Sequence, residues 1–84
     1  MARILRLPTV LDRTGDTRSP LYQKTADGTF TKGVKLGGSR AVGWPEHEVE
    51  EIISARIRGD GPDALRKLVQ RLHEARLLAR PPAA

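Results

Sequence analysis

The chain has 84 residues and a net charge of +5, and its isoelectric point is about 10.5. The absence of cysteine excludes disulfides and thiolate metal sites. One Phe, one Trp and one Tyr leave a small, mainly aliphatic core. No apolar run approaches the roughly 20 residues of a membrane span, and the first residues lack a signal-peptide core. We expect a cytoplasmic protein, with no membrane contact, that binds an acidic partner such as nucleic acid.

The positive charge is concentrated in two parts of the chain. Residues 1–45 carry a net charge of +5, residues 46–60 a net charge of −3, and residues 61–84 a net charge of +3. An acidic partner is therefore expected to contact the first and last segments rather than the segment between them.

The N-terminal residues predict a short extended segment and then a short helix. Residues 3–7 alternate apolar and basic side chains, which fits either a strand that pairs with a later hairpin or a free arm. Pro8 can open a helix over residues 9–13, with Val10 and Leu11 as candidate core residues. Gly15 suits the left-handed conformation that ends a helix.

A second helix is predicted after a tight turn. Thr17 is a suitable N-cap, and Pro20 is tolerated because amides of the first turn lack partners within the helix. The helix continues to Ala26, and Asp27-Gly28 closes it. Its expected core face consists of Leu21, Tyr22 and Thr25.

A small hairpin and a third helix follow. Residues 34–36 and 41–44 predict two strands around a glycine-rich tip at residues 37–40. Phe30 and Trp44 are expected in the core. The third helix opens at residues 45–48, and its expected apolar stripe consists of Val49, Ile52, Ile53 and Ile57. The fold class predicted from these elements is mainly α with a small β-hairpin.

A fourth helix is predicted beyond a break at residues 59–62, which contain Gly, Asp, Gly and Pro. We therefore divide the chain into a domain at residues 1–58, a linker at 59–62 and a C-terminal amphipathic helix with a short tail at 63–84. Two interpretations of this helix stay open: it folds back to enlarge the core, or it packs on another subunit. The apolar stripe slightly favours self-association through Leu65, Leu68 and Leu72.

The second helix and the hairpin form the candidate DNA-binding unit. Arg, Ser, Gln and Lys side chains can contact base edges and phosphates, so we assign Arg18, Ser19, Gln23 and Lys24 to the major groove. Lys35, Ser39 and Arg40 belong to the hairpin, where an arginine can enter the minor groove, and Lys32 is assigned to phosphates. The alternatives are an ordinary helix with a solvated polar face and a plain turn that happens to carry an arginine.

No motif indicates an enzyme, a cofactor or a metal site. His47 and His73 lack clear ligand partners and are expected at the surface. The acidic residues Glu46, Glu48, Glu50 and Glu51 have no nucleophile or base near them in the sequence, so a solvated face is the preferred interpretation.

Several local strings resemble the AlpA family of phage and integrative-element regulators. They are residues 7–10 (LPTV), Thr14-Gly15, Arg18-Ser19, Leu21-Tyr22, residues 26–30 (ADGTF), residues 34–37 (VKLG) and residues 40–44 (RAVGW). The resembling segment runs from about Arg3 to Ile57. Asp16 departs from the family pattern, because this turn position is usually apolar.

The resemblance implies a winged helix-turn-helix of the excisionase and MerR type, followed here by a C-terminal helix. It implies a double-stranded DNA partner, association with the nucleoid, and regulation of excision genes or the direction of recombination with a tyrosine integrase. Copies bound side by side are expected to bend the DNA. The alternative is a basic protein-interaction module whose C-terminal helix docks on a partner protein.

Overall fold

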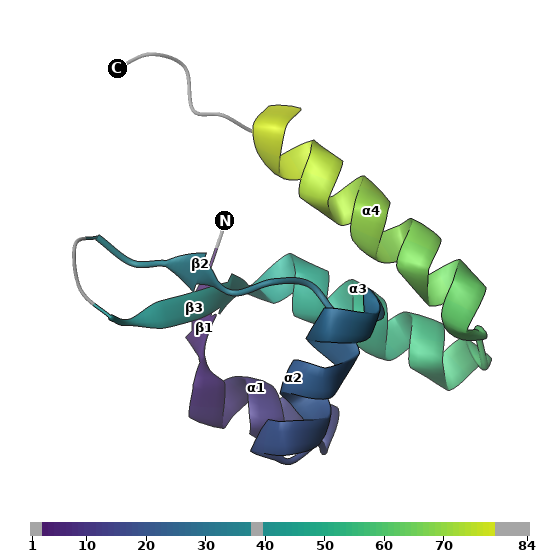
Figure 1. Ribbon diagram of the computed structural model, residues 1–84, viewed down its shortest axis with the longest axis horizontal. Helices are drawn as coiled ribbons and strands as arrows, with labels where there is room; N and C mark the ends of the chain where they lie inside the picture. Colours follow the sequence, from purple (N-terminus) through teal and green to yellow (C-terminus); the bar gives the residue numbers. More distant parts are fainter. Residues whose placement is uncertain (1–2, 38–39, 79–84) are drawn as a thin grey trace.

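The computed structural model describes residues 3–37 and 40–78. Within them the chain is mainly helical, with a three-stranded antiparallel sheet at one end of the helices (Figure 1). The elements in order are β1 (Ile4–Arg6), α1 (Leu7–Thr14), α2 (Arg18–Asp27), β2 (Val34–Lys35), β3 (Val42–Pro45), α3 (Glu46–Arg58) and α4 (Pro62–Leu78).

The sheet has the strand order β1-β3-β2, with both neighbouring pairs antiparallel. Residues 4–6 thus form a strand, which decides between the two interpretations of this segment. Trp44 of β3 lies opposite Leu5 and is 2% exposed, as expected for a core residue. Its indole N–H donates to the carbonyl oxygen of Thr31 at 3.2 Å, so the burial of the ring leaves no unpaired donor.

Gly43 is required by the close approach of β1 to β3. A Cβ at this position would collide with the side chain of Ile4 and lie 3.2 Å from the carbonyl oxygen of Leu5. We expect Gly43→Ala to lower the free energy of unfolding by about 1–3 kcal/mol through overpacking. Urea unfolding measures the change. Gly61→Ala is the matched control because a Cβ there meets nothing within 4 Å; equal losses in the two variants would contradict the explanation.

The core collects residues from every helix and from strands β1 and β3. It consists of Leu5, Val10, Leu21, Phe30, Trp44, Val49, Ile52, Val69 and Leu72. Of the other predicted core residues, Leu11 and Ile53 are partly buried against this cluster, and Thr25 is half-buried. Tyr22 and Ile57 lie outside the core, since Tyr22 is 46% exposed and Ile57 is 81% exposed. Tyr22 is rotated about 100° around α2 from the buried Leu21. Ile57 lies in the last turn of α3, about 80° around the helix from Val49.

Glycines end the first two helices as predicted. Gly15 and Gly28 adopt left-handed φ angles of 76° and 83°, and their N–H groups bond back to carbonyl oxygens of α1 and α2. Thr17 is the N-cap of α2 by backbone conformation, although its side chain makes no capping hydrogen bond. Residues 15–17 therefore form a short, defined turn between α1 and α2.

Helix α4 folds back along α3 instead of standing apart from the rest of the chain (Figure 1). Val69 and Leu72 are buried in the common core, while Leu65 and Leu68 are half-buried. Of the two interpretations of this helix, the structure shows the one in which it enlarges the core. The predicted break at residues 59–62 corresponds to the turn that reverses the chain between α3 and α4.

A buried ion pair also joins α3 to α4. Glu48 has no exposed surface, which corrects the prediction of a solvated acidic face at this position. Its carboxylate accepts hydrogen bonds from Nε of Arg76 at 2.7 Å and from Nη2 at 2.5 Å. The carboxylate is buried because α4 covers the N-terminal part of α3 and supplies this cation.

Candidate nucleic-acid interface

Helix α2 presents three of its four predicted DNA-contacting residues to solvent. Arg18, Ser19 and Gln23 are exposed, and Gln23 donates to the carboxylate of Asp27 at 3.2 Å, one helical turn away. Lys24 is placed differently, because its Nζ lies 2.6 Å from Oδ1 of Asp16 in an ion pair. The charge of Lys24 is thus paired with Asp16 inside the fold. Arg18 is the cation of α2 that has no acidic partner among the described residues.

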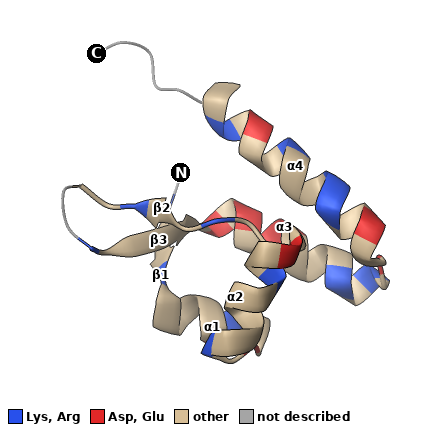
Figure 2. Cartoon of the chain, viewed as in Figure 1, with Lys and Arg blue, Asp and Glu red and all other residues tan. Residues whose placement is uncertain are grey.

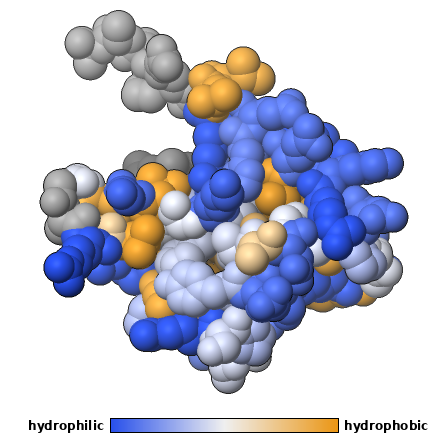
Figure 3. Space-filling model, in the orientation of Figure 1, coloured by the Kyte–Doolittle hydropathy of each residue, from blue (hydrophilic) through white to orange (hydrophobic). Residues whose placement is uncertain are grey.

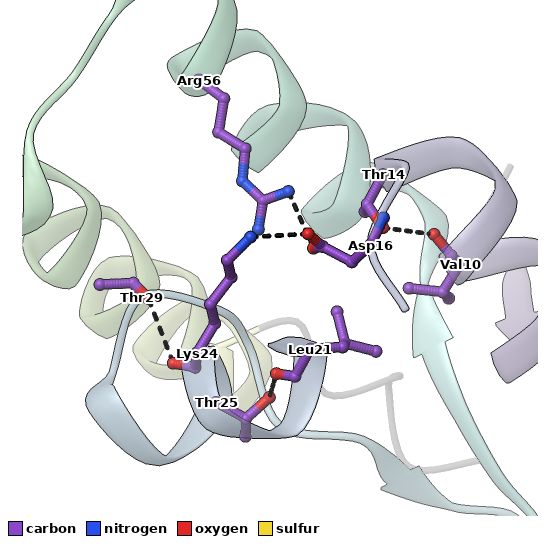
Figure 4. A network of polar contacts seen from close by, with 8 residues as sticks. All are labelled: Val10, Thr14, Asp16, Leu21, Lys24, Thr25, Thr29 and Arg56. Atoms are coloured by element: carbon purple, nitrogen blue, oxygen red, sulfur yellow. Dashed lines mark hydrogen bonds and ion pairs between the residues drawn. The ribbon is translucent and has the colours of Figure 1, made fainter. Parts of the chain in front are cut away.

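Asp16 joins the turn between α1 and α2 to the end of α3 (Figure 4). Besides Lys24, its carboxylate binds Nη1 of Arg56 at 3.1 Å, and the Arg56 guanidinium lies over the Phe30 ring at 5.7 Å. Burial by itself would raise the pKa of Asp16. The hydrogen bond from Lys24 and the charge of Arg56 outweigh it, so that the pKa lies below its usual value. Asp16 therefore forms a polar centre at this turn, with Lys24 and Arg56 as its partners.

The hairpin carries only positive charge. No Asp or Glu occurs between Asp27 and Glu46, and Figure 2 shows Lys and Arg on β2 and beside the hairpin tip. Lys32, Lys35 and Arg40 are all exposed, whereas Ser39 lies outside the described residues. Gly37 has a φ angle of 66°, a conformation suited to glycine as the chain enters the tip.

Ion pairing separates the cations of this chain into two groups. Within residues 3–37 and 40–78, Arg13, Lys24, Arg56 and Arg76 pair with partly or fully buried carboxylates. In the same part of the chain, Lys67 and Arg71 of α4 have no acidic partner. Neither do five side chains from β1, α2 and the hairpin with its approach: Arg6, Arg18, Lys32, Lys35 and Arg40. These five side chains are available to bind phosphates.

Two exposed residues at this interface, Arg6 and Tyr22, were not assigned to DNA binding from the sequence. Arg6 lies in β1 opposite Gly43, which places it beside the hairpin. The alternation of basic and apolar residues at 3–7 was the available signal for it. Tyr22 projects from α2 and is 46% exposed, next to the exposed Gln23. Its spacing from Leu21 and Thr25 had suggested a position on the core face of the helix.

The two histidines differ in their exposure to solvent. His47 is exposed, while His73 is half-buried and accepts a hydrogen bond from the Lys32 N–H at 3.2 Å. Burial and the charge of Arg76 lower the pKa of His73. Among the described residues no group of three His, Asp or Glu side chains could hold a metal ion. No described helix is long and apolar enough to span a membrane.

Comparison with known proteins identifies the family. The model for the prophage CP4-57 regulatory protein (AlpA) matches residues 3–57. The chain is 40% identical over 62 residues to the DNA-binding transcriptional activator AlpA of Escherichia coli (strain K12), covering 67% of this chain and 87% of that protein. It is 39% identical over 57 residues to uncharacterized protein ORF88 of Enterobacteria phage P4, covering 68% of this chain and 64% of that protein. No solved structure matches it.

The chain therefore belongs to the AlpA family of prophage regulatory proteins, which confirms the resemblance. The matched segment contains the sheet, α1, α2 and nearly all of α3, and it ends before α4 begins. The candidate interface thus lies within the family match, whereas the helix that completes the core lies outside it.

Proposed function

We propose that this protein is a DNA-binding transcriptional regulator of a mobile element, built as a winged helix-turn-helix. In this proposal α1 and α2 form the helix-turn-helix, α2 enters the major groove, and the β2–β3 hairpin is the wing beside it. The observation that carries the proposal is the set of exposed cations without acidic partners on β1, α2 and the hairpin. The DNA-binding activator named among its relatives supports the same conclusion.

The proposed contacts are of two kinds: some side chains bind base edges and others bind phosphates. Ser19 and Gln23 on α2 have the donors and acceptors needed to bind base edges, with Arg18 beside them. Lys32 and Lys35 are assigned to phosphates, and Arg40 and Ser39 to the minor groove or its phosphates. Arg6 is added to the phosphate contacts because it flanks the hairpin.

Replacing Arg40 with alanine tests the wing. We expect weaker binding to all duplex sequences and a salt dependence whose slope falls by about 0.9, the value for one lost phosphate contact. Fluorescence anisotropy with labelled duplexes at several salt concentrations measures both quantities. Arg58→Ala is the control, because this exposed arginine lies at the end of α3 far from the hairpin and pairs with Asp60. Equal effects of the two substitutions would count against the wing.

We further propose a role in excision, either through transcription of excision genes or as a recombination directionality factor that acts with a tyrosine integrase. Binding of several copies to adjacent sites would bend the DNA and place the integrase sites together. Footprinting on DNA that flanks the gene identifies the sites. A recombination assay with and without the protein then distinguishes a direct role from a transcriptional one.

Self-association along DNA stays a prediction, and the structure changes how it should be tested. Leu72 is 6% exposed within the chain's own core, so a truncation before α4 would disturb the fold itself. Leu77 and Leu78 are 74% and 87% exposed, and Figure 3 shows apolar surface at that end of α4. If α4 mediates self-association, Leu77→Ser/Leu78→Ser should reduce cooperative DNA binding and leave the melting temperature unchanged. Unaltered cooperativity would exclude this end of α4.

The alternative is a protein-interaction module with a basic docking surface. Gel shifts with random duplex DNA separate the two candidates. Micromolar, salt-sensitive binding is expected for the DNA-binding protein, whereas no binding at low salt would favour the interaction module.

A further inference from the structure

Helix α4 binds both ends of the segment that joins α2 to the hairpin. Where α2 ends, Nε of Arg66 donates to the carbonyl oxygen of Asp27 at 3.0 Å. At the start of the hairpin, the N–H of Lys32 donates to Nε2 of His73 at 3.2 Å, and its carbonyl oxygen accepts from Nη2 of Arg76 at 2.7 Å. The backbone of residues 27–32 is thus held from α4 at two places.

Helix α4, which provides these contacts, is firmly packed in the core. Arg66, His73 and Arg76 lie within about 80° of one another around α4. The same helix buries Val69 and Leu72 in the core, and Arg76 also binds the buried carboxylate of Glu48. Because α4 cannot shift without disturbing the core, its polar side chains are fixed points for the segment that they bind.

The segment itself has no regular secondary structure. Besides the contacts from α4, it is held by the Thr29 N–H that donates to the Lys24 carbonyl oxygen and by the Trp44 N–H that donates to the Thr31 carbonyl oxygen. Residues 29–33 are in neither helix nor strand, although Phe30 and Thr31 are buried. A protein that inserts a helix and a hairpin into neighbouring grooves needs both at a fixed spacing, since ordering them during binding costs affinity. We propose that Arg66 and His73 are positioning residues, which fix the hairpin relative to α2 and thereby strengthen DNA binding without touching DNA. This inference rests on the proposed function.

Distance measurements between spin labels test the positioning directly. The chain has no cysteine, so Ser19→Cys and Lys35→Cys place one label on α2 and one on the hairpin without competing sites. In the full chain we expect a narrow distance distribution. It should broaden when Arg66→Ala and His73→Ala are combined, at a temperature where circular dichroism shows a folded protein. An unchanged width in the combined variant would overturn the proposal.

Two further variants separate positioning from a general effect of charge or stability. Arg71→Ala removes an exposed cation of α4 that makes no hydrogen bond or ion pair with the described residues, and it should leave the distribution narrow. His73→Gln retains an acceptor for the Lys32 N–H and should also keep it narrow. Broadening in Arg71→Ala equal to that in the combined variant would contradict a specific role for the two contacts.

Binding measurements then test the consequence for DNA. The combined Arg66→Ala/His73→Ala variant should bind duplex DNA about three- to tenfold more weakly. Arg40→Ala should cost less affinity in that background than in the parent, because a loosely held hairpin contributes less. Additive losses would overturn the positioning role. If the parent binds no duplex DNA, the proposed function fails, while the spin-label distances still decide whether α4 fixes the segment.

Discussion

Replacing Arg76 with alanine is expected to lower the free energy of unfolding by about 3–5 kcal/mol, because it leaves a buried carboxylate without its cation. Glu48 is fully buried, and Arg76 is the cation that pairs with it among the described residues. Domains of this kind have a total stability of about 5–15 kcal/mol. The melting temperature should therefore fall by more than about 10 °C, as measured by circular dichroism.

Two controls identify the cause of that loss. Removing both charges with Glu48→Leu/Arg76→Leu should recover most of the stability, because the penalty comes from the unpaired charge. Arg58→Ala breaks an ion pair in which the arginine side chain is 63% exposed, so it should change stability by less than about 0.5 kcal/mol. A double variant no more stable than Arg76→Ala would show that packing, rather than charge, explains the effect.

Asp16→Ala is expected to cost about 2 kcal/mol, since it removes the common partner of Lys24 and Arg56. We expect a smaller cost than for the fully buried pair of Glu48 and Arg76, because the Lys24 side chain is 38% exposed and water screens its charge. Arg56 is more enclosed, and its Nη2 is already buried with no hydrogen-bond partner among the described residues. Urea unfolding measures the loss. Asp12→Ala is the control, because Asp12 is exposed and pairs with no described residue; a similar loss there would refute the assignment.

The lowered pKa of the Asp16 carboxyl group predicts that the stability of the protein depends on pH. The pKa of Asp16 is lower in the folded protein than the ordinary value of 3.8, so the unfolded chain binds its proton first as the pH falls. The stability from Asp16 is complete above pH 3.8 and is lost as the pH falls through the lower folded pKa. The difference in unfolding free energy between the parent and Asp16→Asn should therefore shrink below about pH 4. A constant difference down to pH 2 would contradict this explanation.

The sequence by itself determined most of the local structure and the charge of the hairpin. Turn residues fix where helices end, so Gly15 and Gly28 could be assigned without any tertiary information. The absence of acidic residues between Asp27 and Glu46 likewise predicts a cationic hairpin in whatever orientation it packs. The strings between residues 7 and 44 together indicated the family.

Only the tertiary structure decided which charges are free and what α4 does. Lys24 could be assigned to DNA from its helix, but its partner Asp16 lies in the preceding turn and is shared with Arg56, 40 residues further on. The sequence around Glu48 predicts a solvated residue, but in the structure Glu48 is buried and pairs with Arg76 of α4. Periodicity reports which side of a helix is apolar, whereas pairing depends on which helix packs there, and that is set by the whole core.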